Sequence, residues 1–390
     1  MDLTEYLHRR GATLTDLDIG VGKALGRSGE DVLFASGSLV EDLGNPHSDL
    51  DLYLISARTD VPCDIHVLPL GSVTVDVAVM RPDELDRLLA RFEEYTRQER
   101  DTGEAWKFSP DERLLLHRLV VGRAIWRPDT LGALQARINP IALASHKLNY
   151  ALHAAKRLQL DLEGCRVAGD WQTMLLAAQD LLNQTIDGLL AGYVKTNPTE
   201  KWRAQLLKRL PSNWDLQIPG RVSGRPALDH YLVLNRLPSF FDAASVYDYA
   251  LQIAAFSRRI FPWAGWKLCS FGRTESSFGS LYDKAPARKA AEVCEEKLCH
   301  LELDVLFVYS EEKFQARRLS TTDGAFDLSA EAVNILCHFD GVSDQETAEK
   351  ADGRCESMPL CDAHSFIASA GFRARGMVDD DTIGKLLKRS

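Results

Sequence analysis

The stretch FASGSLVEDLGNPHSDLDLYLIS, Phe34 to Ser56, decides how this chain is read. Its end, residues 49–56, alternates polar and apolar side chains, which predicts a β-strand. Asp49 and Asp51 stand two residues apart in that strand, so both carboxylates leave the same face. Buried carboxylates are costly unless a cation meets them. A cation is therefore expected at this face of the sheet.

The sequence around this stretch predicts a small α/β domain with a mixed sheet. Apolar runs with period 2 indicate strands, and apolar side chains at helical spacing indicate helices. The expected elements are a helix at 14–27, strands at 31–36, 49–56, 63–68 and 72–80, and a helix from Pro82 onward.

A third carboxylate is expected beside the first two. Asp76 is the only charge in the run VTVDVAV, and it meets Asp49 and Asp51 if the two strands are neighbours. Three unpaired carboxylates would repel one another and raise each other's pKa. Mg²⁺ relieves this repulsion, because it prefers carboxylate oxygens plus substrate phosphates. Two such ions about 4 Å apart can hold both the attacking and the leaving oxygen of a phosphoryl displacement.

The pair Gly37-Ser38 follows the first strand and precedes a predicted short helix at 39–43. Glycine lets the backbone approach a phosphate closely, and Ser38 adds a hydroxyl group. A helix N-terminus supplies free N–H groups and a positive dipole end. A triphosphate is therefore expected between this turn and the metal ions.

Together these residues resemble the polymerase β-type nucleotidyltransferase superfamily. The resemblance rests on Gly37-Ser38, on the run from Ser48 to Leu52 and on Asp76, and it covers about residues 30–80. It implies transfer of a nucleoside monophosphate from an NTP to an acceptor, with release of pyrophosphate. Two Mg²⁺ ions, with Mn²⁺ as a substitute, are the implied cofactors.

The resemblance also implies a role for each matching residue. Gly37 and Ser38, with Ser48 beside them, would bind the nucleotide. The two strand carboxylates, Asp49 and Asp51, would ligate both metal ions. The third, Asp76, would ligate the catalytic ion and activate the acceptor hydroxyl.

Residues 138–210 have helical periodicity and predict a bundle. Polar side chains share one face of the second helix: Asp180, Asn183, Gln184 and Asp187. This region loosely resembles the helical substrate domain of antibiotic nucleotidyltransferases, in which a carboxylate can deprotonate the acceptor. Asp180 or Asp187 is therefore a candidate general base. An ordinary solvated face explains the same pattern.

Two further features of this region have both a functional and an ordinary interpretation. Lys147, early in the preceding helix, would stabilise the outgoing pyrophosphate or simply face solvent. Between Lys195 and Arg225 positive charge is in excess and tryptophans interleave. That segment would bind phosphates or RNA, or be an exposed helix face.

The C-terminal part predicts three short strands and two helices over roughly 302–352. This order resembles small peptide-recognition domains of ribosomal-peptide and quinone-cofactor biosynthesis, which bind a leader peptide as an extra strand. A winged-helix module gives a similar order.

Two groups of Cys and His residues in the C-terminal part suggest zinc sites: Cys294, Cys299 and His300; Cys355, Cys361 and His364. Their spacing departs from the usual spacing of zinc ligands. Buried thiols explain these cysteines as well.

Composition limits the remaining choices. A net charge of −10 disfavours broad nonspecific binding to nucleic acid. No apolar run reaches the roughly 20 residues needed to cross a bilayer, and the N-terminal stretch has no apolar signal core. A cytoplasmic protein with no membrane partner is expected.

The overall expectation is a mixed α/β fold in four parts. They are a nucleotidyltransferase domain at 1–128, a helical acceptor domain at 129–265, a connecting segment at 266–300 and a small α+β domain at 301–390. The expected function is Mg²⁺-dependent transfer of a nucleotide to a small-molecule or peptide acceptor. The alternatives are a second-messenger or RNA-directed transferase with the same core, and a peptide-binding scaffold without catalysis.

Overall fold

The chain forms two compact units in the computed structural model. The first unit holds residues up to Leu143 together with Thr196–Gln205, and the second holds Ala144–Lys195 and the chain from Leu206 onward. The structure describes residues 2–70, 73–97, 108–216, 218–220, 224–270, 301, 303–310, 313–320, 325–328, 330, 333, 336 and 337.

The first unit is built on a five-stranded mixed sheet in the order β3-β4-β2-β1-β5. β2 runs parallel to β4, and the other neighbouring pairs are antiparallel. The strands are β1 (Val32–Ser36), β2 (Leu50–Ile55), β3 (Ile65–Leu70), β4 (Val73–Met80) and β5 (Arg123–Ala124). The helices of this unit are α1 (Leu3–Arg9), α2 (Leu14–Leu25), α3 (Pro82–Arg97), α4 (Pro110–Val121), α5 (Pro128–Ala136) and the start of α6 (Pro140–Ala168).

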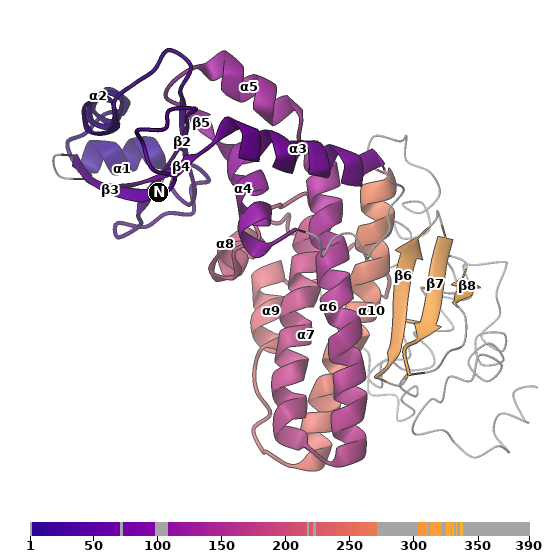
Figure 1. The fold of residues 1–390 in the computed structure, drawn as a ribbon. Helices are drawn as coiled ribbons and strands as arrows, with labels where there is room; N and C mark the ends of the chain where they lie inside the picture. Colours follow the sequence, from indigo (N-terminus) through magenta and orange to yellow (C-terminus); the bar gives the residue numbers. More distant parts are fainter. Residues whose placement is uncertain are drawn as a thin grey trace, which may run out of the picture. The chain divides into compact units, whose positions relative to one another are not determined.

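Strand alternation gives the sheet two apolar faces, each covered by helices (Figure 1). One face packs on α1 and α2 through Leu33, Ala35, Leu50, Leu52, Leu54, Val75 and Val77. The other packs on α3, α4 and α5 through Val32, Phe34 and Ile55. Because side chains alternate along a strand, Asp51 and Asp76 belong to this second face. From this side, Arg118 of α4 reaches Asp51.

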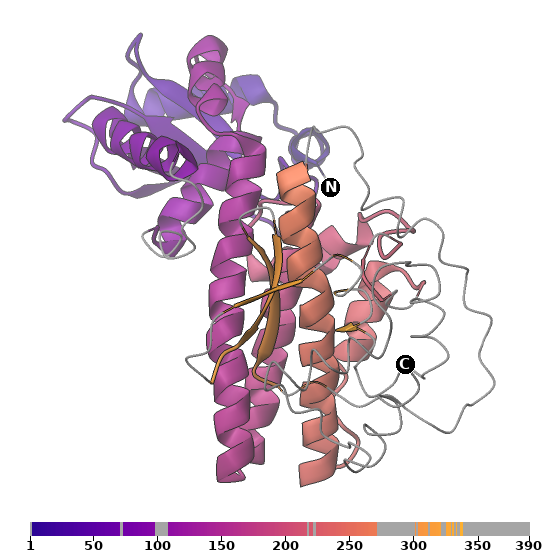
Figure 2. The same ribbon diagram turned by 90° about the vertical axis from the view of Figure 1, so that its right-hand side faces the viewer.

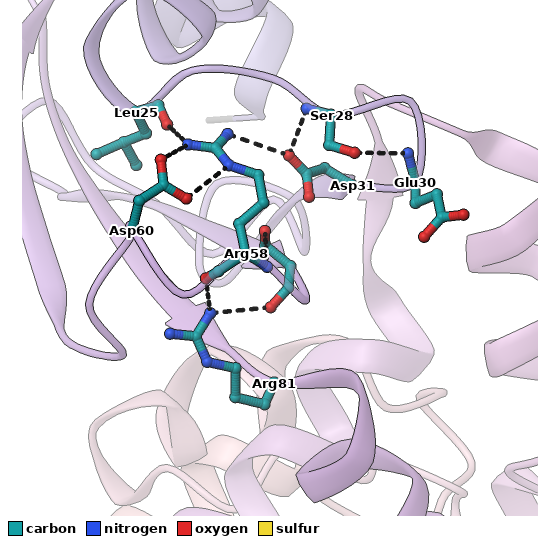
Figure 3. Close-up of polar contacts among 8 residues, drawn as sticks. Leu25, Ser28, Glu30, Asp31, Arg58, Asp60 and Arg81 are labelled. Carbon is teal, nitrogen blue, oxygen red and sulfur yellow. Dashed lines mark hydrogen bonds and ion pairs between the residues drawn. The ribbon is translucent and has the colours of Figure 1, made fainter.

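Two arginines fasten the loops at the far end of β2 and β4 (Figure 3). Arg58 donates to the Leu25 carbonyl at the end of α2 and pairs with the carboxylates of Asp31 and Asp60. Arg81 donates to the carbonyls of Ser56, Arg58 and Val61. These bonds fix the end of the sheet opposite to Asp51 and Asp76, so they support the fold rather than the carboxylates.

The second unit consists of long helices and a small sheet. The helices are most of α6, α7 (Trp171–Gly192), α9 (Ala227–Leu234) and α10 (Ala243–Ser270). Three of them, α6, α7 and α10, run side by side in both views (Figure 2). Gly192 of α7 lets Trp263 of α10 approach closely, because a Cβ there would lie 2.5 Å from the indole ring.

A three-stranded antiparallel sheet lies against α10, in the order β6 (Val305–Ser310), β7 (Lys313–Arg318) and β8 (Phe326–Leu328). Arg258 of α10 is 2% exposed and donates to the carbonyls of Leu301 and Val305. The small sheet is thereby part of the second unit's packing.

The predicted fold class, a mixed helix and sheet protein with a mixed sheet, is confirmed. The first unit extends past the predicted boundary at residue 128, because Leu131, Ile138 and Leu143 pack into its core. The predicted divisions at 265 and 300 stay predictions. Of the first predicted C-terminal helix the structure describes residues 330, 333 and 336, which are helical, whereas the second helix and the two Cys/His groups lie outside the described residues.

No helix in the described part of the chain combines the length and the apolar character that a membrane span requires.

Candidate active site

Two carboxylates stand side by side, one near the start of β2 and the other in the middle of β4. Asp51 and Asp76 are direct partners in the parallel register, and both side chains leave the face covered by α4. Asp49 precedes β2 and is exposed. Asp51 keeps 31% of its side chain accessible, so solvent and ligands can reach it.

Arg118 is the cation that meets Asp51 in this structure. Its Nη2 lies 3.3 Å from Asp51 Oδ2, and its side chain is only 14% exposed. α4 begins with a capping box between Ser109 and Glu112, and Arg118 lies in its last turn. Ser36 Oγ donates to the Arg118 carbonyl at 2.8 Å, which fastens that turn to the end of β1.

The charges around Asp51 are coupled. Burial raises the pKa of the Asp51 carboxyl, the Arg118 charge opposes this shift, and the charges of Asp49 and Asp76 add to it. Lys201 also lowers the pKa. The Asp51 carboxyl therefore feels two neighbouring carboxylates and two cations.

The ion pair of Arg118 and Asp51 packs against Gly37. The φ of Gly37, 88°, lies in the left-handed region that glycine tolerates best. A Cβ there would lie 2.1 Å from Arg118 Nη1 and 2.2 Å from Asp51 Oδ2. A larger residue at position 37 would therefore have to displace the guanidinium and the carboxylate.

The helix predicted at 39–43 is absent, and a hydrogen-bonded turn stands in its place. The amides of Val40 and Glu41 donate to the Gly37 carbonyl, and the amide of Leu43 donates to the Ser38 carbonyl. The prediction that a helix dipole supports a phosphate at Gly37-Ser38 is therefore wrong. Ser38 is 9% exposed.

Ser48 has a local role in the loop before β2. Its hydroxyl accepts from the Asn45 amide at 2.8 Å, and its own amide donates to the Asn45 carbonyl. These bonds close the turn that delivers Asp49 and Asp51 to the strand. A nucleotide contact by Ser48 stays a prediction.

Residues 196–205 fold onto the first unit through a polar network, here called the Glu41 network. Glu41 Oε2 accepts from Asn197 Nδ2 at 2.8 Å and lies 3.1 Å from His117 Nε2. His117 Nδ1 lies 2.9 Å from Thr196 Oγ1, and its side chain is 2% exposed. The network holds the segment whose Lys201 acts on Asp51.

The sequence did not indicate Arg118, which belongs to an ordinary amphipathic helix far along the chain. Lys201 had a signal, because it lies in the predicted basic segment between Lys195 and Arg225. The Glu41 network had none, since its members come from three separate stretches.

The donor chemistry of this site fits a divalent cation. Within the described residues, no three His, Cys, Asp or Glu side chains form a group that could hold a metal by themselves. Mg²⁺, however, is usually bound by one or two carboxylates plus substrate phosphates. Asp51 and Asp76, adjacent in register, supply that pair, so the metal would need the nucleotide to complete its shell.

Among known proteins, the chain has likenesses only to solved structures. No protein-family model matches the chain, and no curated protein matches it. A nucleotidyltransferase-like protein from Exiguobacterium sibiricum has a similar solved structure, with a TM-score of 0.29 and 13% sequence identity. The match covers 67% of this chain and 79% of that one. A likeness of this size does not identify a family.

The remaining predicted site residues belong to the second unit. Lys147 Nζ lies 3.4 Å from Asp187 Oδ1, so these two residues form an ion pair between α6 and α7. Lys147 also donates to the Lys195 carbonyl. Asp180 is exposed on α7. Asn183 of the same polar face accepts from the Tyr231 hydroxyl of α9 at 3.3 Å.

Proposed function

We propose that this chain is an Mg²⁺-dependent nucleotidyltransferase. It would move a nucleoside monophosphate from an NTP to an acceptor group on a small molecule or peptide and release pyrophosphate. The observation that carries the proposal is the register of Asp51 against Asp76, beside the glycine turn at Gly37. Paired carboxylates next to a glycine turn suit phosphoryl chemistry better than a structural role.

In this proposal the chain's own residues divide the work. Asp49, Asp51 and Asp76 would hold the metal ions, and Gly37 would let a phosphate approach its backbone. When bound, Mg²⁺ would supply Lewis-acid stabilisation of the charge that develops on the phosphate oxygens. Asp76 would orient the acceptor hydroxyl toward the phosphate. A general base at Asp180 or Asp187, and a pyrophosphate contact by Lys147, stay predictions.

The decisive experiment compares Asp51→Asn with Asp76→Asn. Asp51→Asn should weaken Mg²⁺–NTP binding and also slow transfer, because both ions depend on it. Asp76→Asn should spare binding and reduce transfer on the order of a thousandfold, since only the acceptor-activating ion needs it. Calorimetric titration with each Mg²⁺–NTP and single-turnover transfer of an α-labelled NTP, with cell extract as acceptor source, measure the two effects.

Asp83→Asn is the matched control, because Asp83 is an exposed aspartate of α3 that forms an ion pair with Arg87 on its own helix. It should change neither binding nor transfer. An Asp76→Asn protein that transfers at the wild-type rate would contradict the assignment. A wild-type protein that binds no Mg²⁺–NTP would instead favour a scaffold without catalysis.

A further inference from the structure

The guanidinium of Arg118 occupies the place where the proposed function needs other groups. Arg118 Nη1 and Asp51 Oδ2 both lie against Gly37, at the position that a Cβ would take. Arg118 Nη2 contacts the same carboxylate oxygen at 3.3 Å. The guanidinium therefore fills the space over the glycine turn and holds the carboxylate that would bind a metal ion.

Arg118 also has donor capacity that the protein does not use. Its Nε is buried and has no hydrogen-bond partner among the described residues. Tyr53, on the same face of β2, contacts the guanidinium through its hydroxyl. A guanidinium carries five N–H donors in a planar fork that matches the oxygens of a phosphate. The unused donor is what a planar, two-pronged phosphate contact would employ.

A metal ion and Arg118 compete for Asp51. A divalent cation on Asp51 Oδ2 would stand within a few ångströms of the guanidinium, and like charges at that distance repel. Arg118 must then leave the carboxylate, and its side chain, 14% exposed, needs a new anion nearby. The phosphate oxygens of an NTP bring that anion together with the metal.

We propose that Arg118 is a phosphate-binding residue of this site, which neutralises Asp51 in the free protein and moves to a nucleotide phosphate when a divalent cation takes Asp51. This inference rests on the proposed function. It makes the binding of metal and nucleotide interdependent: the cation alone binds weakly because Arg118 opposes it, and the Mg²⁺–NTP complex binds well because it gives Arg118 a new partner.

The test measures binding of Mn²⁺ alone and of Mg²⁺–NTP to the full chain carrying Arg118→Gln. Mn²⁺ binding, followed by electron paramagnetic resonance, should strengthen about tenfold because the competing charge is gone. Binding of Mg²⁺ with a non-hydrolysable NTP analogue should weaken by roughly ten- to a hundredfold, since one charge-assisted contact is lost. Arg91→Gln, which breaks the ion pair with Glu112, is the matched control and should change neither affinity.

Arg118→Lys keeps the positive charge but removes the planar fork of N–H donors. This variant provides the test if Arg118→Gln does not fold. It should keep Mn²⁺ binding weak and still lose affinity for the Mg²⁺–NTP analogue. Unchanged or weaker Mn²⁺ binding in Arg118→Gln overturns the proposal. So does stronger Mn²⁺ binding with unchanged nucleotide affinity, because Arg118 would then be a counter-charge only.

The two hypotheses fail in different ways. If the wild-type chain binds neither Mn²⁺ nor any Mg²⁺–NTP, the proposed function is wrong, and the role of Arg118 falls with it. If the wild-type chain binds Mg²⁺–NTP but the Arg118 variants do not show the expected changes in Mn²⁺ and nucleotide affinity, the proposed function stands and the role of Arg118 is wrong.

Discussion

Gly37 is the residue at which backbone geometry and charge meet most closely. We expect Gly37→Ala to lose about 1 to 3 kcal/mol of stability from backbone strain. It should also push Arg118 and Asp51 apart, because its Cβ would lie near 2.1 Å from the guanidinium. Chemical denaturation gives the stability change, and Mg²⁺–NTP titration gives the effect on the site, where we expect weaker binding.

Gly11→Ala separates these two effects. Gly11 also has a positive φ, of 64°, but nothing lies within 4 Å of the position its Cβ would take. The control should therefore show backbone strain with unchanged nucleotide binding. Equal loss of nucleotide affinity in both variants would show that crowding at Gly37 has no special effect on the site.

At the scale of single elements, Arg81 fastens the start of α3 to the loop after β2. Arg81→Met should lower the free energy of unfolding by about 2 to 4 kcal/mol, because three carbonyl acceptors lose a charged donor. Nucleotide binding should persist, since Asp51 lies near the opposite end of β2 and Asp76 in the middle of β4, away from the loop that Arg81 holds.

Arg87→Met is the control on the same helix. Arg87 forms an exposed ion pair with Asp83, which lies one helical turn earlier. Such pairs contribute less than about 1 kcal/mol to the free energy of unfolding. Urea denaturation of both variants makes the comparison. If Arg81→Met unfolds no more easily than Arg87→Met, the loop after β2 does not depend on these bonds.

The elements also show which parts of the fold and of the site can be predicted from the sequence. β2 and β4 were predictable because alternation is a local property, and the adjacency of Asp51 and Asp76 followed once those strands became neighbours. The helix predicted at 39–43 does not form, because five residues barely offset the cost of helix nucleation and Pro46 follows closely. Arg118 could not be predicted, since its contact with Asp51 depends on how α4 packs across the sheet.

At the scale of the whole molecule, the second unit depends on its small sheet. A chain that ends at residue 300 loses β6, together with the carbonyls that accept from buried Arg258. We therefore expect a clearly lower melting temperature for the second unit, measured by calorimetry, while the first unit still binds Mg²⁺–NTP.

A chain that ends at Cys337 is the control, because it keeps all three strands of the small sheet. It should melt close to the full chain. If the chain ending at residue 300 melts at the wild-type temperature as well, the packing of β6 on α10 contributes nothing measurable.

The return of Thr196–Gln205 to the first unit has a consequence for how the protein is made. This unit is discontinuous in sequence, so it is not complete when Leu143 leaves the ribosome. The partners of Glu41 and His117 arrive only about 50 to 60 residues later, a delay of roughly 3 to 12 s at typical rates of synthesis. During that interval the rest of α6 and all of α7 are synthesised. Until then the nascent first unit lacks the contacts that Thr196 makes with His117 and Asn197 makes with Glu41, so its completion is set by translation rather than by its own core.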